Sequence, residues 1–134
     1  MKTGWAFALL LIFIGAVVWL RYVQDDSNGS SVYTDGRIRM ELQAEPLVSR
    51  SMEETAFRLL VTEESGTPVI DADLQLFISM PNMYCGVFQG AITQSQPGVY
   101  IATAIPVMQG RWHAEAVLRR ENGPIRVHSQ FDVR

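Results

Sequence analysis

The chain has 134 residues, 48% of them hydrophobic, and a formal net charge of −3. This length suits one ordinary domain rather than two, and the negative charge without a basic patch excludes nucleic acid as the expected partner. The single cysteine, Cys85, excludes an intramolecular disulfide.

The N-terminal segment is predicted to anchor the protein in a membrane. Residues 4–20 carry no charge, and as a helix they would span roughly 25 Å, close to the thickness of a bilayer's hydrocarbon core. Trp5 and Trp19 stand near the two ends of this run, where aromatic residues border a bilayer. A cleaved signal peptide is the alternative, but bulky residues occupy the place of a small-residue cleavage site. We therefore expect residues 1–23 to form an uncleaved anchor.

The predicted anchor is followed by a tether and one domain. The short N-terminal side is expected in the cytoplasm, which places the domain in the periplasm or on the outer face of a cell with one membrane. Residues 24–36 are polar and rich in Gly and Ser, as in flexible linkers. Residues 37–134 then make up the extracytoplasmic domain.

Period-two alternation of apolar and polar residues predicts β-strands throughout residues 37–134. Turn signals rich in Gly, Pro and Asn separate them. The expected strands are 38–44, 56–62, 72–80, 87–93, 99–105, 112–118 and 125–133. Seven short strands with frequent turns predict an all-β protein: an immunoglobulin-like antiparallel β-sandwich of about seven strands, preceded by one transmembrane helix.

The parity of the strands predicts which connections lie together. If each strand reverses the direction of the chain, alternate connections share one end of the sandwich. One end then holds the connections 46–53, 80–86 and 106–110. The tether is expected to enter at the opposite end, with the turns 64–68, 94–98 and 122–124, so the first end would be distal to the membrane.

Side chains that favour soft metals gather at this predicted membrane-distal end. Met80, Met83 and Cys85 belong to one connection, and Met108 and His113 belong to the next connection and the strand after it. Thiolates and thioethers select Cu(I), and imidazole also accepts copper. These five residues therefore predict a Cu(I) site, in which Met83 and Cys85 are the foremost candidates because they lie in the loop.

Each candidate also has a purely structural interpretation. Met80 continues the inward alternation of its strand, and Cys85 suits a small buried hydrophobic position. His113 follows the inward-pointing Trp112, so alternation turns it away from the core; His128 is interpreted as a surface or half-buried residue. Cys85 and His113 could instead form a nucleophile and base, but no third group orients them. We therefore expect a binding protein rather than an enzyme.

The order of several short motifs supports a family resemblance. The motifs are GTPV at 66–69, MPNM at 80–83, GVYIA at 98–102, MQGRW at 108–112 and FDV at 131–133. In this order they resemble the YtkA-like and FixH-like families, whose members are small membrane-anchored β-sandwiches outside the cytoplasm. The resemblance covers most of residues 37–134, and the N-terminal anchor fits it too.

The resemblance implies a role in copper supply or in the assembly of haem-copper oxidases. It implies copper ligation by Met80, Met83 and Met108, although the His often expected just after the second Met is absent and Cys85 stands near that place. The expected function is that of a membrane-anchored accessory protein. It would handle Cu(I) for a haem-copper oxidase or a metal exporter. The alternative is a non-metal immunoglobulin-like module that stabilises a membrane protein complex.

Overall fold

The structure is a computed structural model that describes these residues: 12, 14–16, 30–84 and 86–134. Most of the predicted anchor 1–23, and residues 24–29 of the predicted tether, lie outside this part of the chain. Residues 12 and 14–16 are helical. No helix among the described residues is long and apolar enough to cross a membrane.

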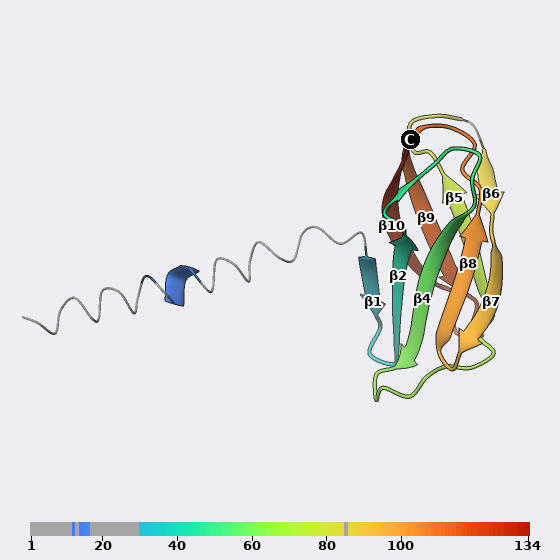
Figure 1. The fold of residues 1–134 in the computed structure, drawn as a ribbon. Helices are drawn as coiled ribbons and strands as arrows, with labels where there is room; N and C mark the ends of the chain where they lie inside the picture. Colours follow the sequence, from blue (N-terminus) through green and yellow to red (C-terminus); the bar gives the residue numbers. More distant parts are fainter. Residues whose placement is uncertain (1–11, 13, 17–29, 85) are drawn as a thin grey trace, which may run out of the picture.

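From Ser30 onward, the described residues form two five-stranded sheets packed face to face (Figure 1). The first sheet has the strand order β1-β2-β4-β8-β7, and the second has the order β3-β10-β9-β5-β6. The strands are β1 Ser30–Thr34, β2 Ile38–Glu45, β3 Val48–Ser49, β4 Thr55–Glu63, β5 Leu74–Ser79, β6 Val87–Gln89, β7 Ala91–Gln96, β8 Val99–Ala104, β9 Gly110–Leu118 and β10 Ile125–Val133.

This strand order confirms the predicted β-sandwich. Strands β2-β4-β8-β7 and β10-β9-β5 follow the ABED and GFC order of immunoglobulin sandwiches. All neighbouring strands are antiparallel except β3 and β10, which are parallel. Six of the seven predicted strands are present at nearly the expected positions, as β2, β4, β5, β8, β9 and β10.

The alternation that predicted the strands also builds the core. Inward-facing residues of both sheets are fully or almost fully buried between them, and outward-facing residues are more exposed. The rings of Phe57 in β4 and Phe131 in β10 meet edge to face across the two sheets, with centroids 5.1 Å apart. The largest side chains that are completely buried are Trp112, Phe57, Met40, Leu42, Leu59, Leu76 and Ile78.

The single strand expected at 87–93 is instead two strands in different sheets. β6 pairs with β5 in the second sheet, whereas β7 pairs with β8 in the first. Gly90 makes the crossing: its N–H donates to the carbonyl oxygen of Leu76 at 2.9 Å. A Cβ at Gly90 would lie 2.7 Å from the carbonyl oxygen of Thr103. Glycine is needed here because the chain passes too close to the β8 backbone for a side chain.

We expect Gly90→Ala to lower the free energy of unfolding by about 1–3 kcal/mol, because the added methyl group must displace the backbone around Thr103. The urea midpoint of the purified protein measures this. Gln89→Ala, at the exposed neighbouring position, is the matched control and should leave the midpoint almost unchanged. Equal midpoints for Gly90→Ala and the unchanged chain would show that the crossing tolerates a Cβ.

The predicted flexible tether 24–36 contains a strand that the sequence analysis missed. β1 pairs antiparallel with β2, from Ser30 opposite Gln43 to Thr34 opposite Arg39. This strand adds one more reversal of the chain. The sandwich therefore begins at Ser30 beside Gln43, toward the end of β2 that leads into β3, and the predicted entry at the opposite end was wrong.

The short strand β3 was also missed, because two residues carry no alternation pattern. Val48 and Ser49 pair with Asp132 and Val133 of β10. The N–H of Arg134 donates to the carbonyl oxygen of Ser49 at 2.9 Å. The segment after β2 is thereby attached to the last strand of the second sheet.

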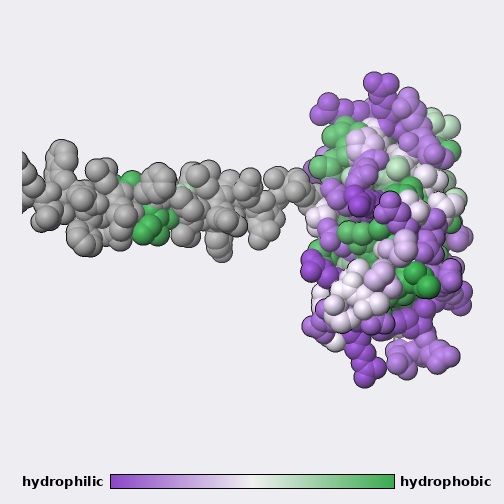
Figure 2. All heavy atoms as spheres, turned by 60° about the horizontal axis from the view of Figure 1, so that its bottom comes forward, coloured by the Kyte–Doolittle hydropathy of each residue, from purple (hydrophilic) through white to green (hydrophobic). Residues whose placement is uncertain are grey.

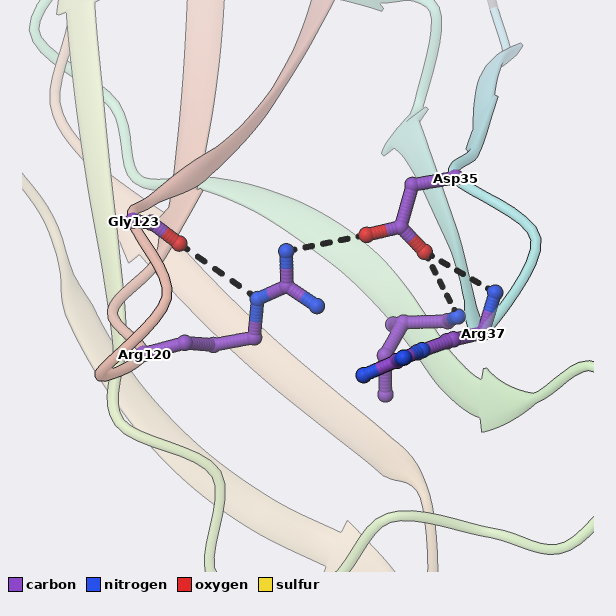
Figure 3. A network of polar contacts seen from close by, with 5 residues as sticks. Asp35, Arg37, Arg120 and Gly123 are labelled. Carbon is purple, nitrogen blue, oxygen red and sulfur yellow. Dashed lines mark hydrogen bonds and ion pairs between the residues drawn. The ribbon is translucent and has the colours of Figure 1, made fainter.

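A polar network joins two turns at the end of the sandwich opposite the C-terminus (Figure 3). The carboxylate of Asp35 accepts hydrogen bonds from the backbone N–H groups of Arg37 at 3.0 Å and Ile38 at 2.9 Å, and from the Arg120 guanidinium at 2.9 Å. Arg120 also donates to the carbonyl oxygen of Gly123. The N–H of Ile38, then that of Arg37, and then the guanidinium of Arg120 hold the pKa of Asp35 below its ordinary value. The ionised carboxylate is therefore the form that stabilises this junction.

The lowered pKa of Asp35 predicts a pH-dependent contribution to stability. The contribution is complete above the unfolded-state pKa of about 4, and it is lost as the pH falls toward the lower folded-state pKa. Asp35→Asn should therefore lower the urea midpoint at neutral pH, and its difference from the unchanged chain should shrink below about pH 4. Asp73→Asn is the control, because the carboxylate of Asp73 makes an exposed ion pair with Arg119 at 3.9 Å, and such pairs contribute little to stability. A difference for Asp35→Asn that stayed constant with pH would contradict this account.

Candidate metal site

Three connections meet at the end of the sandwich where the C-terminus lies (Figure 1). The N–H of Met52, between β3 and β4, donates to the carbonyl oxygen of Pro106, between β8 and β9, at 2.8 Å. Met80, which follows β5, touches the start of β9: a Cβ at Gly110 would lie 2.7 Å from Met80 Cε. These contacts confirm that the connections 46–53, 80–86 and 106–110 share one end.

Four of the six methionines in the chain belong to this end. Met80 is half-buried and packs against the core. Met52, Met83 and Met108 are exposed at 69%, 48% and 39%. Met52 was missed as a candidate, although parity had already placed the connection 46–53 here; its residue type was the available signal. The structural interpretation of Met80 is thus supported, and the other thioethers are accessible from outside.

The connection between β5 and β6 forms a shallow hollow of about 390 Å³. Its turn is closed by a long hydrogen bond from the N–H of Met83 to the carbonyl oxygen of Met80, at 3.5 Å. Met80 and Met83 both line the hollow, whereas Met108 lies on the adjacent connection and does not. Cys85, the predicted thiolate ligand, lies outside the described residues. The full set of lining residues is Ser79, Met80, Pro81, Asn82, Met83, Tyr84, Gly86 and Val87.

His113 lies on the outer face of the second sheet. In the strand register it stands opposite Ser79 on β5 and opposite Gln130 on β10. It is half-buried, and it lines a separate hollow of about 300 Å³ together with the exposed His128. The structure therefore places His113 one strand away from the methionine-lined hollow, and not inside it as the predicted copper site required. Its outward direction agrees with its position next to the inward-pointing Trp112.

Trp112 attaches the connection before β9 to the core. Its side chain is completely buried. Its indole Nε1 donates to the carbonyl oxygen of Met108 at 2.9 Å, and its ring lies 5.9 Å from that of Phe88. The backbone of Met108 is thus held by a buried side chain, while the thioether of Met108 is exposed.

The donor atoms gathered at this end determine which metals suit it. Among residues 12, 14–16, 30–84 and 86–134, no group of three or more His, Cys, Asp and Glu side chains is placed to hold a metal ion. The connection before β4 carries the carboxylates of Glu53 and Glu54, and the soft side-chain donors that the described loops bring to this end are thioether sulfurs. Such soft, neutral donors favour Cu(I) over calcium or zinc.

Comparisons with known proteins support the fold alone. No family model and no curated protein sequence matches the chain. A DUF4785 family protein from Legionella pneumophila is similar in structure, with a TM-score of 0.57 and 14% identity over 75% of this chain. This chain covers only 29% of that protein.

Two further solved structures are small domains. The filamin domain of Lin-41 has a TM-score of 0.53 and 15% identity, covering 81% of this chain and 94% of its own. The soluble domain of PmoD from a Methylocystis species has a TM-score of 0.49 and 13% identity, covering 78% of this chain and 97% of its own; this similarity is too low to carry an argument about function. The chain is a β-sandwich, and its membership of the YtkA-like or FixH-like family stays a prediction.

Proposed function

We propose that this chain is a membrane-anchored, extracytoplasmic immunoglobulin-like module that binds Cu(I) at its methionine-bearing end. It would pass the metal to a membrane complex, either a haem-copper oxidase during assembly or a metal exporter. The supporting observation is that Met83 and Met108 are exposed on two connections at one end of the sandwich, and that half-buried Met80 lines the same hollow as Met83. The proposed role is binding and transfer, without catalysis.

The proposed ligands differ in what they contribute. Met80 and Met83 line the hollow. Met52 and Met108 lie on two other connections at this end, which are joined by the hydrogen bond from the N–H of Met52 to the carbonyl oxygen of Pro106. Cys85 is proposed as the thiolate, because it follows Met83 by two positions in the same connection. Thioethers are neutral and comparatively weak donors, so a site rich in them suits a metal that must leave again.

An anaerobic titration of the full chain with Cu(I) against a competing chelator tests this function. We expect binding, and we expect Met83→Leu combined with Met108→Leu to weaken it severalfold, because two soft donors are replaced by hydrocarbon. Met40→Leu is the matched control: it removes a thioether that is fully buried in the core, away from the site. No competitive binding by the unchanged chain, or an equal loss in Met40→Leu, would contradict the proposal.

The alternative function, a non-metal module that stabilises a membrane complex, is favoured by one observation. Several side chains at the same end are apolar without being metal donors, and they are exposed: Leu47, Val48, Val87 and Ile105. If the chain binds no Cu(I), these exposed apolar side chains are best interpreted as a surface that contacts another protein. The copper titration therefore separates the two functions directly.

A further inference from the structure

Exposed apolar side chains concentrate at one end of the sandwich. This apolar end consists of Leu47, Val48, Met52, Met83, Tyr84, Val87, Ile105 and Met108, each at least 36% exposed. Tyr84 is the most exposed of them. In Figure 2, where the opposite end comes forward, hydrophilic side chains project from that end. Ile70 is the one large apolar side chain in the turns of the opposite end that is exposed among the described residues.

Charge is distributed in the reverse way. The connections at the apolar end carry three charged residues: Arg50, Glu53 and Glu54. Those at the opposite end carry eight: Asp35, Arg37, Glu64, Asp71, Asp73, Arg119, Arg120 and Glu121. Arg134 also lies at the apolar end and is exposed. Moving the apolar end out of bulk water would therefore desolvate fewer charges than moving the opposite end.

The chain enters the sandwich on the side of the apolar end. Ser30, the first residue of β1, pairs with Gln43, close to the last residue of β2, Glu45. The predicted anchor ends at residue 23, so residues 24–29 alone would connect it to β1. Even fully extended, they span at most roughly 20 Å. A tether this short holds the sandwich against the bilayer and keeps the apolar end within reach of it.

We propose that the apolar end rests in the interfacial layer of the same bilayer that holds residues 1–23. This inference depends on the membrane attachment proposed above, but not on copper. Tyr84 suits this layer because a tyrosine presents an apolar ring with a polar tip. Met83, Ile105 and Met108 would lie at the boundary between headgroups and acyl chains. The methionine-bearing loops would then face the membrane, whereas the entry point predicted from sequence had placed them at the membrane-distal end.

Lipid quenching in nanodiscs tests this contact with the full chain. In a Cys85→Ala background, Ile105→Cys at the apolar end and Ile70→Cys at the opposite end each receive the same fluorescent label. The two positions are matched, since the isoleucines are 47% and 60% exposed. The discs contain phosphatidylcholine and phosphatidylglycerol, with or without a quencher attached near the headgroup. Co-elution of the chain with the discs is measured separately.

We expect the quencher to reduce the fluorescence at position 105 by about twofold or more, since apolar groups at an interface lie within ~5–10 Å of the headgroup boundary. Position 70 should be unaffected, and adding Tyr84→Asp should weaken the quenching at 105. Equal quenching at both positions overturns the inference. So does a label at 105 that is shielded from aqueous iodide but not quenched by lipid, which would indicate a second copy or a protein partner.

Two further outcomes distinguish this inference from the proposed function. If the chain fails to co-elute with the discs, the membrane attachment is wrong, and the inference falls with it. If it co-elutes without selective quenching, only the docking of the apolar end is wrong. The experiment is run without added copper, so its result does not depend on whether the chain binds the metal.

Discussion

Trp112→Ala should lower the free energy of unfolding by about 3–5 kcal/mol, the usual cost of emptying a large buried aromatic site. The side chain is completely buried, and its ring packs against that of Phe88. A loss of this size is a large share of the roughly 5–15 kcal/mol that stabilises a small domain. Urea unfolding monitored by circular dichroism measures this loss. The variant is expected to be only marginally stable.

A second substitution separates packing from hydrogen bonding at this position. Trp112→Phe keeps an aromatic ring in the core but removes the bond from Nε1 to the carbonyl oxygen of Met108. It should cost less than Trp112→Ala and should still leave a folded protein. His128→Ala, on the exposed face of β10, is the surface control and should change the midpoint little. If Trp112→Ala unfolded at the same urea concentration as this control, Trp112 would contribute nothing to the core.

Cys85→Ser should weaken Cu(I) binding by more than about tenfold, equivalent to roughly 1.4 kcal/mol. The substitution replaces a soft thiolate by a hard, mostly protonated hydroxyl, whereas Met83→Leu or Met108→Leu removes only a neutral donor. Binding to the unchanged chain should also release a proton near neutral pH, because a free thiol is mostly protonated there and a bound one is not. Competition with a chelator and a weakly buffered pH measurement test both expectations.

The urea midpoint of Cys85→Ser supplies the control for this prediction. If Cys85 is a metal ligand in an exposed loop, the fold tolerates its replacement by the near-isosteric serine. The urea midpoint should then barely change. A buried structural cysteine would give the reverse pattern, because the hydroxyl group would be placed in an apolar site. Unchanged copper affinity with a lowered midpoint would remove Cys85 from the proposed site.

The strands with clear alternation were predictable from sequence, because each buries one face and exposes the other. Residues 38–44, for example, show the pattern directly, and the structure buries Met40, Leu42 and Ala44 there. The prediction of a single strand at 87–93 was wrong because both halves of this segment are edge strands that expose most of their side chains. Their sequence therefore shows no clear alternation. The need for glycine at position 90 comes from the backbone of Thr103, a distant contact that no local pattern contains.

The missed strand β1 shows how one local error changes a global prediction. Its sequence, SSVYT, lies in a Gly/Ser-rich stretch, and the consecutive residues Val32 and Tyr33 are both exposed, so nothing in the pattern indicates burial. It is a strand because β2 offers an unpaired edge. Parity still placed the three loop connections correctly, because they depend only on the strands that follow.

The candidate site was predictable in outline only. Alternation correctly turned His113 outward and Met80 inward. Which thioethers share a hollow depends on the path of each loop, and loop paths follow from tertiary contacts such as the packing of Met80 on Gly110. Sequence spacing could therefore name the donors Met80, Met83 and Met108, but not their grouping.

The position of β10 has a consequence for how this chain folds. β10 pairs with β9 on one side and with β3 on the other, and it supplies Ile125, Val127, Phe131 and Val133 to the core. The two sheets cannot pack together until β10, the last of the strands in chain order, is available to fold. Until then the apolar faces of β2 and β4 stay exposed to water. Domains with such long-range strand pairing fold in milliseconds to seconds, and strands that stay unpaired during this time are prone to aggregate. A chain threaded across a membrane from its N-terminal side would therefore complete this fold only after β10 had crossed, and a holding chaperone on the far side would raise its yield.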